Sequence, residues 1–356
     1  MTRARFARLL ALAVMLVAGA VAASPAPAVE NAYTVHPLVS DGSVPAPTID
    51  PHLVNAWGLT ASATSPWWVA DNGTDLSTLY NAAGTPLALV VSVPGAPTGA
   101  VFNSTAVFVV KNGDLSGPAR FLFDTESGTI LGWNPAVSVT TAVVAVDRSN
   151  LGAIYKGLTL ATATGGPRLY AADFHNARID VFDGTFALVT EPGAFVDPSL
   201  PSGYAPFNVQ AIGSRIFVSY AKQDAAGEDE IAGHGLGFVD AYDADGHLLA
   251  RVAQHGQLNA PWGLALAPAD FGGFSGDLLV GNFGDGRINA YEEQADGSFE
   301  RVGGLRGADG RAIAIDGLWA LQFGHGAPNN GPTNTLFFTA GPNDEAGGLF
   351  GSITAG

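Results

Sequence analysis

The stretch that decides the fold is Leu53–Tyr80, which reads LVNAWGLTASATSPWWVADNGTDLSTLY. It divides into an apolar segment, a turn, a second apolar segment with paired tryptophans, a turn rich in Asp, Asn and Gly, and a third segment that ends in tyrosine. Short runs of β-branched and aromatic residues between such turns are typical of β-strands. The stretch therefore predicts three strands in succession.

The same order of segments recurs along the chain. Asn55-Ala-Trp-Gly-Leu returns as Asn259-Ala-Pro-Trp-Gly-Leu and, more loosely, as Asp316-Gly-Leu-Trp-Ala-Leu. Apolar residues at nearly every position of the second segments indicate strands that are buried on both faces. We assign six second strands on this basis: Trp67–Ala70, Ala106–Val110, Arg168–Ala172, Arg215–Ser219, Asp277–Gly281 and Thr335–Thr339.

Six units of roughly 40–60 residues match the blades of a β-propeller. We therefore predict an all-β fold, a six-bladed β-propeller that forms a single domain over residues 29–356. A pair of β-sandwiches is the competing fold, but it does not explain why tryptophan recurs in register.

The sixth unit ends with its third strand at Gly348–Thr354, and the strand-like segment Tyr33–Ser40 belongs to no unit. We expect this segment to join the last blade and close the ring.

The first residues have the pattern of a targeting segment. Arg3, Arg5 and Arg8 precede the apolar run Leu9–Ala23, and small residues follow it, as in a secretory signal peptide. We predict a signal peptide and short leader over residues 1–28, with cleavage after Ala23 or Ala28. The alternative is an uncleaved anchor, but the run is shorter than the ~20 apolar residues that a membrane span needs. The mature protein is expected to be secreted or periplasmic, with no membrane contact.

Composition restricts the partners and the chemistry. The net charge is −16, from 32 acidic and 16 basic residues, which disfavours nucleic acid and suits cationic ligands. The chain contains no cysteine, which excludes disulfides, a thiolate nucleophile and sulfur-ligated metals. We expect a monomer whose partner is an unidentified small molecule or an extracellular partner.

Turns after the second strands and turns before the inner strands should open on one face of a propeller. Lys111–Asp114 is the turn expected for the second blade. The simpler interpretation of the Asn and Asp residues in these turns is that tight turns require them. The sharper interpretation is a ligand-binding face around the axis. Its candidate residues are Asn55, Asp71, Asn72, Asp173, Asn208, Asn282 and Asp316.

Carboxylate and amide oxygens from several blades suit Ca²⁺ or another divalent cation. Asp71, Asp173 and Asp316 are the candidate metal ligands. The sequence that begins at Asp71 resembles half of an EF-hand loop, but Ala82 stands at the position where that loop needs glutamate. Only a composite site, built from several blades, is consistent with the sequence.

Other candidate chemistry in the sequence concerns a general base, a serine nucleophile and an aromatic binding surface. His175 lies beside Asp173 and is the candidate for a general base. The serine in Gly273-Phe-Ser-Gly lacks the spacing and the strand–helix context of a nucleophile elbow. The segment Glu228–Glu230 is predicted to be a solvated loop. Two roles are open for the recurring tryptophans, a stacking platform at the tunnel or packing between blades; they are Trp57, Trp262 and Trp319.

The motifs VNAWGL, PWWVADNGT, STLY and NAPWGLALAP together resemble a bacterial family of secreted, functionally uncharacterised proteins. Many members of that family carry a C-terminal PEP-CTERM sorting tail. The resemblance covers essentially the whole mature chain and implies a six-bladed propeller related to NHL-repeat domains. It supplies no catalytic residue. The chain ends in Ile353-Thr-Ala-Gly without such a tail, so surface sorting is not expected.

The predicted fold also resembles that of gluconolactonase-like hydrolases, whose metal is held at the tunnel by acidic and Asn ligands. Asn55, Asn208 and Asp316 take comparable positions, but no Glu of the first blade completes the set, since Glu30 lies ahead of it. Two functional hypotheses follow. The first is a non-catalytic binding or scaffold module with an Asp/Asn-rich face, and the alternative is a metal-dependent hydrolase of the gluconolactonase-like type.

Overall fold

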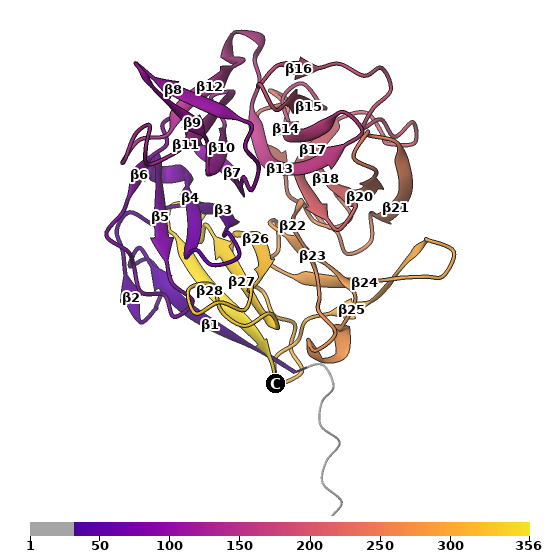
Figure 1. The fold of residues 1–356 in the computed structure, drawn as a ribbon. Helices are drawn as coiled ribbons and strands as arrows, with labels where there is room; N and C mark the ends of the chain where they lie inside the picture. The colour runs from indigo at the N-terminus through magenta and orange to yellow at the C-terminus, as the bar shows by residue number, and fades with distance from the viewer. Residues whose placement is uncertain (1–31) are drawn as a thin grey trace, which may run out of the picture.

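The computed structural model describes residues 32–356, and over that range it contains strands and three short 3₁₀ turns but no α-helix. The 3₁₀ turns are η1 (Asn72–Thr74), η2 (Ser149–Leu151) and η3 (Gly272–Phe274). Six sheets form a ring of blades (Figure 1). The predicted six-bladed β-propeller is therefore confirmed, whereas the predicted signal peptide lies outside the described residues.

Each blade is built on an antiparallel meander that runs from an inner strand at the axis to an outer strand at the rim. Blade 1 contains β3 (Ala56–Thr60), β4 (Trp67–Asp71), β5 (Leu76–Tyr80) and β6 (Val91–Ser92), and blade 2 contains β7 (Pro97–Phe102), β10 (Phe121–Thr125), β11 (Thr129–Trp133) and β12 (Val143–Asp147). Blade 3 contains β13 (Tyr155–Ala163), β14 (Gly166–Asp173), β15 (Arg178–Asp183) and β16 (Leu188–Val189).

Blade 4 contains β17 (Tyr204–Ile212), β18 (Arg215–Gln223), β20 (Phe238–Tyr242) and β21 (Leu248–Gln254), with β19 (Glu230–Ile231) paired to β18. Blade 5 contains β22 (Pro261–Leu266), β23 (Leu278–Asn282), β24 (Ile288–Glu293) and β25 (Phe299–Gly304). Blade 6 contains β26 (Leu318–Phe323), β27 (Thr335–Ala340), β28 (Leu349–Ala355), β1 (Tyr33–Ser40) and β2 (Thr48–Ile49). The inner strands of successive blades contact one another around the axis.

The ring is closed by the N-terminal strand. β1 pairs antiparallel with β28, from Tyr33 opposite Ala355 to Ser40 opposite Leu349, with an irregularity after Pro37. Figure 1 shows β1 beside β28, so the two ends of the described chain meet in one blade. The Tyr33 hydroxyl also donates to the Phe271 carbonyl of the loop in blade 5 at 3.0 Å. The expected closure by Tyr33–Ser40 is confirmed.

The prediction for blade 2 was wrong in one element. The segment Ala106–Val110 is not the second strand, because β8 (Val109–Asn112) pairs only with β9 (Leu115–Pro118) in a separate hairpin. The second strand is β10, which is buried at every position, whereas Val109 is 42% exposed. The turn Lys111–Asp114 therefore closes the hairpin, and Glu126 lies in the turn after β10 instead.

Aromatic side chains fill the spaces between blades. Between blades 1 and 2, the ring of Trp68 stacks on Phe121 with centroids 4.1 Å apart and lies 4.7 Å from Trp133. Buried aromatic residues contribute large apolar areas to a core. Because the chain has no disulfide, this packing and the closed sheets hold the turns of the axial face in place.

Candidate functional site

The axial face carries a buried lysine that contacts carboxylates from two other blades. Lys156, at the start of the inner strand of blade 3, is 1% exposed. Its Nζ lies 2.6 Å from Oε1 of Glu126 in blade 2 and 3.0 Å from Oδ1 of Asp229 in blade 4. Both carboxylates come from turns that follow second strands. These turns therefore do meet on one face, as the repeat pattern predicted.

A chain of side-chain hydrogen bonds extends this contact to two further blades. The Asn55 amide donates to Oε2 of Glu345 at 2.6 Å and to Oδ1 of Asn72 at 3.1 Å. Asn72 in turn donates to Oε2 of Glu126 at 2.9 Å. The contacts thus link blades 6, 1, 2, 3 and 4. We call the group the axial cluster; it consists of Asn55, Asn72, Glu126, Lys156, Asp229, Glu230 and Glu345.

Tryptophans form the floor beneath the axial cluster. Trp57 and Trp319 stack with ring centroids 3.8 Å apart, and Trp262 contacts both edge-on. Trp319 donates its Nε1 hydrogen to Oδ1 of Asn55 at 2.9 Å, and the Lys156 ammonium lies 5.2 Å from the Trp57 ring. All three tryptophans are buried. They come from the inner strands of blades 1, 5 and 6 and pack against one another at the axis, and Trp319 also positions Asn55.

In the axial cluster, carboxyl groups outnumber the single ammonium by four to one. Burial is the main cause that raises the pKa of Glu230 to about 8; Lys156 opposes this shift, and neighbouring Glu345 and Asp229 add to it. Burial also raises the pKa of Glu345, although its hydrogen bond from Asn55 opposes the change. Burial favours neutral Lys156, but its acidic neighbours outweigh this effect and raise the pKa of the lysine. The lysine therefore stays protonated among four carboxyl groups.

Of the seven predicted ligand-binding residues, Asn55 and Asn72 belong to the axial cluster and the other five do not; three of these are Asn208, Asn282 and Asp71. Asn208 is buried and donates to the Trp262 carbonyl at 2.8 Å. Asn282 donates to the Gln257 carbonyl at 2.7 Å. Asp71 is fully buried in blade 1, where it accepts a hydrogen bond from the Thr78 backbone, and burial raises its pKa well above the ordinary value. These three side chains stabilise turns and strands of their own blades and of the blades beside them.

The candidate metal ligands are held separately. Asp173 accepts hydrogen bonds from Asn176 and pairs with Arg178 at 3.1 Å, while exposed Asp316 accepts from the Asn343 backbone at 2.9 Å. Within residues 32–356, no group of three or more His, Asp or Glu side chains is arranged to hold a metal ion. Asp71, Asp173 and Asp316 do not form such a group.

His175 and Asp173, the candidate base and its neighbour, point to different partners. His175 is exposed, and its Nδ1 lies 3.3 Å from the Gly227 carbonyl. The Asp173 carboxylate is fully buried and is occupied by Asn176 and Arg178. No hydrogen bond between the two side chains occurs in the described range. The pair therefore has no general-base geometry in this structure.

Sequence reasoning missed the four carboxyl groups of the axial cluster. Glu126 follows a strand that was assigned to the wrong segment, and Glu345 lies in the turn after β27, where only Asp and Asn residues were considered. Asp229 and Glu230 were predicted to be solvated, but Glu230 is partly buried in β19. The sequence did contain a signal for these residues: the side chain of a glutamate in a turn after a second strand is long enough to reach the axis.

The comparisons place the chain among uncharacterised proteins. No family model matches the sequence. Two solved propeller structures share the fold at low sequence identity. A protein of unknown function from Bacteroides thetaiotaomicron has a TM-score of 0.54 and 11% identity, and the match covers 90% of this chain and 76% of that chain. A streptogramin B lyase has a TM-score of 0.51 and 10% identity, and the match covers 91% of this chain and 97% of that chain. Among residues 32–356, no helix is long and apolar enough to span a bilayer.

Two relatives come from Acanthamoeba polyphaga mimivirus. Uncharacterised protein R648 is 35% identical over 332 residues, which cover 90% of this chain and 80% of the relative. Uncharacterised protein L690 is 33% identical over 336 residues, which cover 90% and 85%. These relatives are viral, and they give no support to the bacterial secreted family or its sorting tail. The chain belongs to the same family of uncharacterised propeller proteins as these two viral relatives.

Proposed function

We propose that this protein is a non-catalytic binding module whose axial face binds an organic cation, a ligand with an ammonium or guanidinium group. One observation carries the proposal. Four carboxyl groups surround a single buried ammonium, and only Glu126 and Asp229 contact its Nζ. Glu230 and Glu345 therefore supply oxygens that the lysine does not occupy. Charge-assisted hydrogen bonds between a cation and carboxylates are about twice as strong as neutral ones.

Accessibility supports the same proposal. The Asp229 side chain is 72% exposed although its carboxylate contacts buried Lys156. A ligand that arrives from solvent therefore meets Asp229 first. The strongly negative chain, at −16, also attracts cations over a distance of roughly 10 Å at moderate ionic strength.

The aromatic floor suits the same class of ligand. Lys156 Nζ lies 5.2 Å from the Trp57 ring and 5.9 Å from the Phe174 ring. Ammonium groups are attracted to aromatic faces at such distances. These contacts of Lys156 support the proposal, because an ammonium group of the chain itself already lies beside the aromatic rings.

Titration with spermidine at low ionic strength tests the proposal, with binding measured by calorimetry. We expect Glu345→Gln to weaken binding roughly tenfold, because one charged contact of about 1.4 kcal/mol is lost. Glu300→Gln, an exposed residue of β25, is the matched control and should bind as the unchanged protein does. Equal affinities of the Glu345 and Glu300 variants, or no binding at all, contradict the proposal. Ca²⁺ in place of spermidine tests the divalent-cation alternative.

We also propose that the protein acts after export, as a monomer in a secreted or periplasmic compartment. The support is the basic and apolar pattern of residues 1–28. Mass spectrometry of the protein recovered from its expressing cell tests this proposal. Mature chains that begin at Ser24 or Val29 are expected, and a full-length chain that starts at Met1 contradicts it.

A further inference from the structure

A second site lies at the outer edge of blade 3, away from the axial cluster. β16 covers only two positions of β15, opposite Val181 and Phe182. The edge of β15 from Arg178 to Asp180 has no strand partner on that side in the described chain. By contrast, β21 covers β20 along its whole length in blade 4. The shortness of β16 leaves a cavity of about 240 Å³ at the blade edge.

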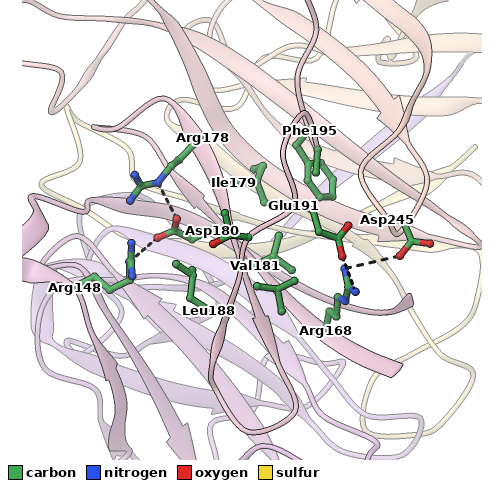
Figure 2. A pocket seen from close by; sticks show the side chains of 13 residues that line it. Arg148, Arg168, Arg178, Ile179, Asp180, Val181, Leu188, Glu191, Phe195 and Asp245 are labelled. Carbon is green, nitrogen blue, oxygen red and sulfur yellow. Dashed lines mark hydrogen bonds and ion pairs between the residues drawn. The ribbon is translucent and has the colours of Figure 1, made fainter. Parts of the chain in front are cut away.

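The cavity has two charged ends and an apolar middle, as Figure 2 shows. At one end, Asp180 lies between Arg148 and Arg178, with each guanidinium at 2.8 Å. At the other end, Arg168 pairs with Glu191 at 2.9 Å and lies 3.8 Å from Asp245. Between the ends stand the apolar side chains of Ile179, Val181, Leu188 and Phe195.

Arg148 has donors that the described chain does not use. Its side chain is only 15% exposed, and its one ion pair within residues 32–356 is to Asp180. The Nε–H of that contact is buried and makes no aligned hydrogen bond. A guanidinium carries five N–H donors in a planar fork that matches a carboxylate. The carboxylate contact of Arg148, to Asp180, is made at Nε, and the two terminal Nη groups make no hydrogen bond within residues 32–356.

Leu188 gives a second indication of a ligand. It lines the cavity and is 42% exposed, although its neighbours Val181 and Phe195 are buried. An apolar chain placed along this wall would remove Leu188 from water. We propose that the cavity binds a medium-chain monocarboxylate, with its head group on Arg148 and its apolar chain over Val181, Leu188 and Phe195.

The charges around the cavity select a single negative charge on the ligand. Asp180, Glu191 and Asp245 already oppose the three arginines. A phosphate dianion would place a second charge close to these carboxylates, and their repulsion would cancel much of its attraction to Arg148. An amine would meet the guanidinium groups directly. A neutral alcohol of the same length would leave the Nη donors of Arg148 without an ionic acceptor.

Calorimetric titration of the intact protein with sodium octanoate tests the proposal, with octan-1-ol and octylamine as matched probes. We expect Arg148→Gln to weaken octanoate binding about tenfold or more and Arg148→Lys to weaken it less, since lysine keeps the charge but loses the fork. Leu188→Trp, at an exposed position of the wall, should also block binding. Arg311→Gln, which removes the same charge from an arginine that is 88% exposed, is the control and should bind normally.

Three results would each overturn the proposal: no octanoate binding at millimolar concentration, equal affinity for octanoate and octanol, or unchanged affinity in both Arg148→Gln and Leu188→Trp. If Arg148→Gln does not fold, Leu188→Trp decides, because it leaves the ion pair of Asp180 intact. The Glu345→Gln variant of the axial cluster should bind octanoate normally, so the two proposed sites succeed or fail independently.

Discussion

The axial cluster and the cavity beside blade 3 both bring charged side chains together, but in different proportions. Around the axis, four carboxyl groups surround one ammonium that is almost completely buried. In the cavity, three guanidinium groups face three carboxylates, and the outermost acid, Glu191, is 42% exposed. In the first region carboxyl groups outnumber the cation, whereas in the second the Nη groups of the largely buried Arg148 make no hydrogen bond within residues 32–356. The same residue types thus predict ligands of opposite sign.

The largest effect should come from removal of the single cation of the axial cluster. Lys156→Met leaves four carboxyl groups without a counter-charge, and breaking a buried ion pair costs about 3–5 kcal/mol. The free energy of unfolding in urea measures the loss. Adding Glu126→Gln to Lys156→Met should recover part of the stability, since it removes the closest carboxylate. A double variant no more stable than the single one would show that packing, rather than charge, accounts for the loss.

Arg148→Met should destabilise the protein less, by about 1–3 kcal/mol. The reason is that Asp180 keeps a hydrogen bond from Arg178 and another from the Tyr155 hydroxyl at 2.9 Å. The same urea experiment applies. A loss as large as that of Lys156→Met would remove the distinction between the two regions, because it would mean that Asp180 depends on Arg148 alone.

Glu230→Gln should change how stability depends on pH. Burial raises the pKa of Glu230 from 4.5 to about 8, so the folded state binds this proton more tightly than the unfolded state does. This group's contribution is therefore complete below pH 4.5 and is lost as the pH rises toward 8. At pH 8 the variant should be more stable by about 1 kcal/mol, since solvent screens a partly exposed group. Melting temperatures at pH 5 and pH 8 measure the difference.

The control for this experiment is Glu228→Gln, an exposed neighbour in the same loop. It should melt in parallel with the unchanged protein at both pH values. A difference between Glu230→Gln and the unchanged protein that is constant across this range would contradict the assignment of the titration to Glu230.

The smallest effect on stability is expected for Glu191→Gln, about 0.5 kcal/mol or less, because exposed ion pairs contribute little. Its pair with Arg168 at 2.9 Å is of this type. The variant also removes a negative charge from the cavity, so octanoate should bind more tightly in the calorimetric titration. Weaker octanoate binding in this variant would contradict the sign that we assign to the cavity.

Most of the fold could be predicted, because each blade repeats a buried second strand between polar turns. The error in blade 2 has a physical cause. Ala106–Val110 and Phe121–Thr125 are both apolar and aromatic, and strand pattern alone does not determine which one pairs with the inner strand β7. That choice depends on packing against Trp68 of blade 1, which the sequence does not specify locally.

The sites were less predictable than the fold. Asn55 and Asn72 were identified because they lie in turns of the repeated motif. Glu230 was not, since its burial depends on a loop of blade 4 that folds back over Lys156. The cavity at blade 3 depends on where β16 ends and on how a loop places Phe195. Such features arise from the lengths of strands and the paths of loops rather than from residue type.

The pairing of β1 with β28 has a consequence for how the protein is made. Its hydrogen bonds join the segments that contain residues 33 and 355. The first strand of the described chain therefore stays without this partner until the last strand has been synthesised. At roughly 5–20 residues per second, that wait is on the order of tens of seconds. During it, β1 has an unpaired edge that could pair with another chain. Pro37, which cannot donate a backbone hydrogen bond, interrupts that edge and limits such mispairing until the ring closes.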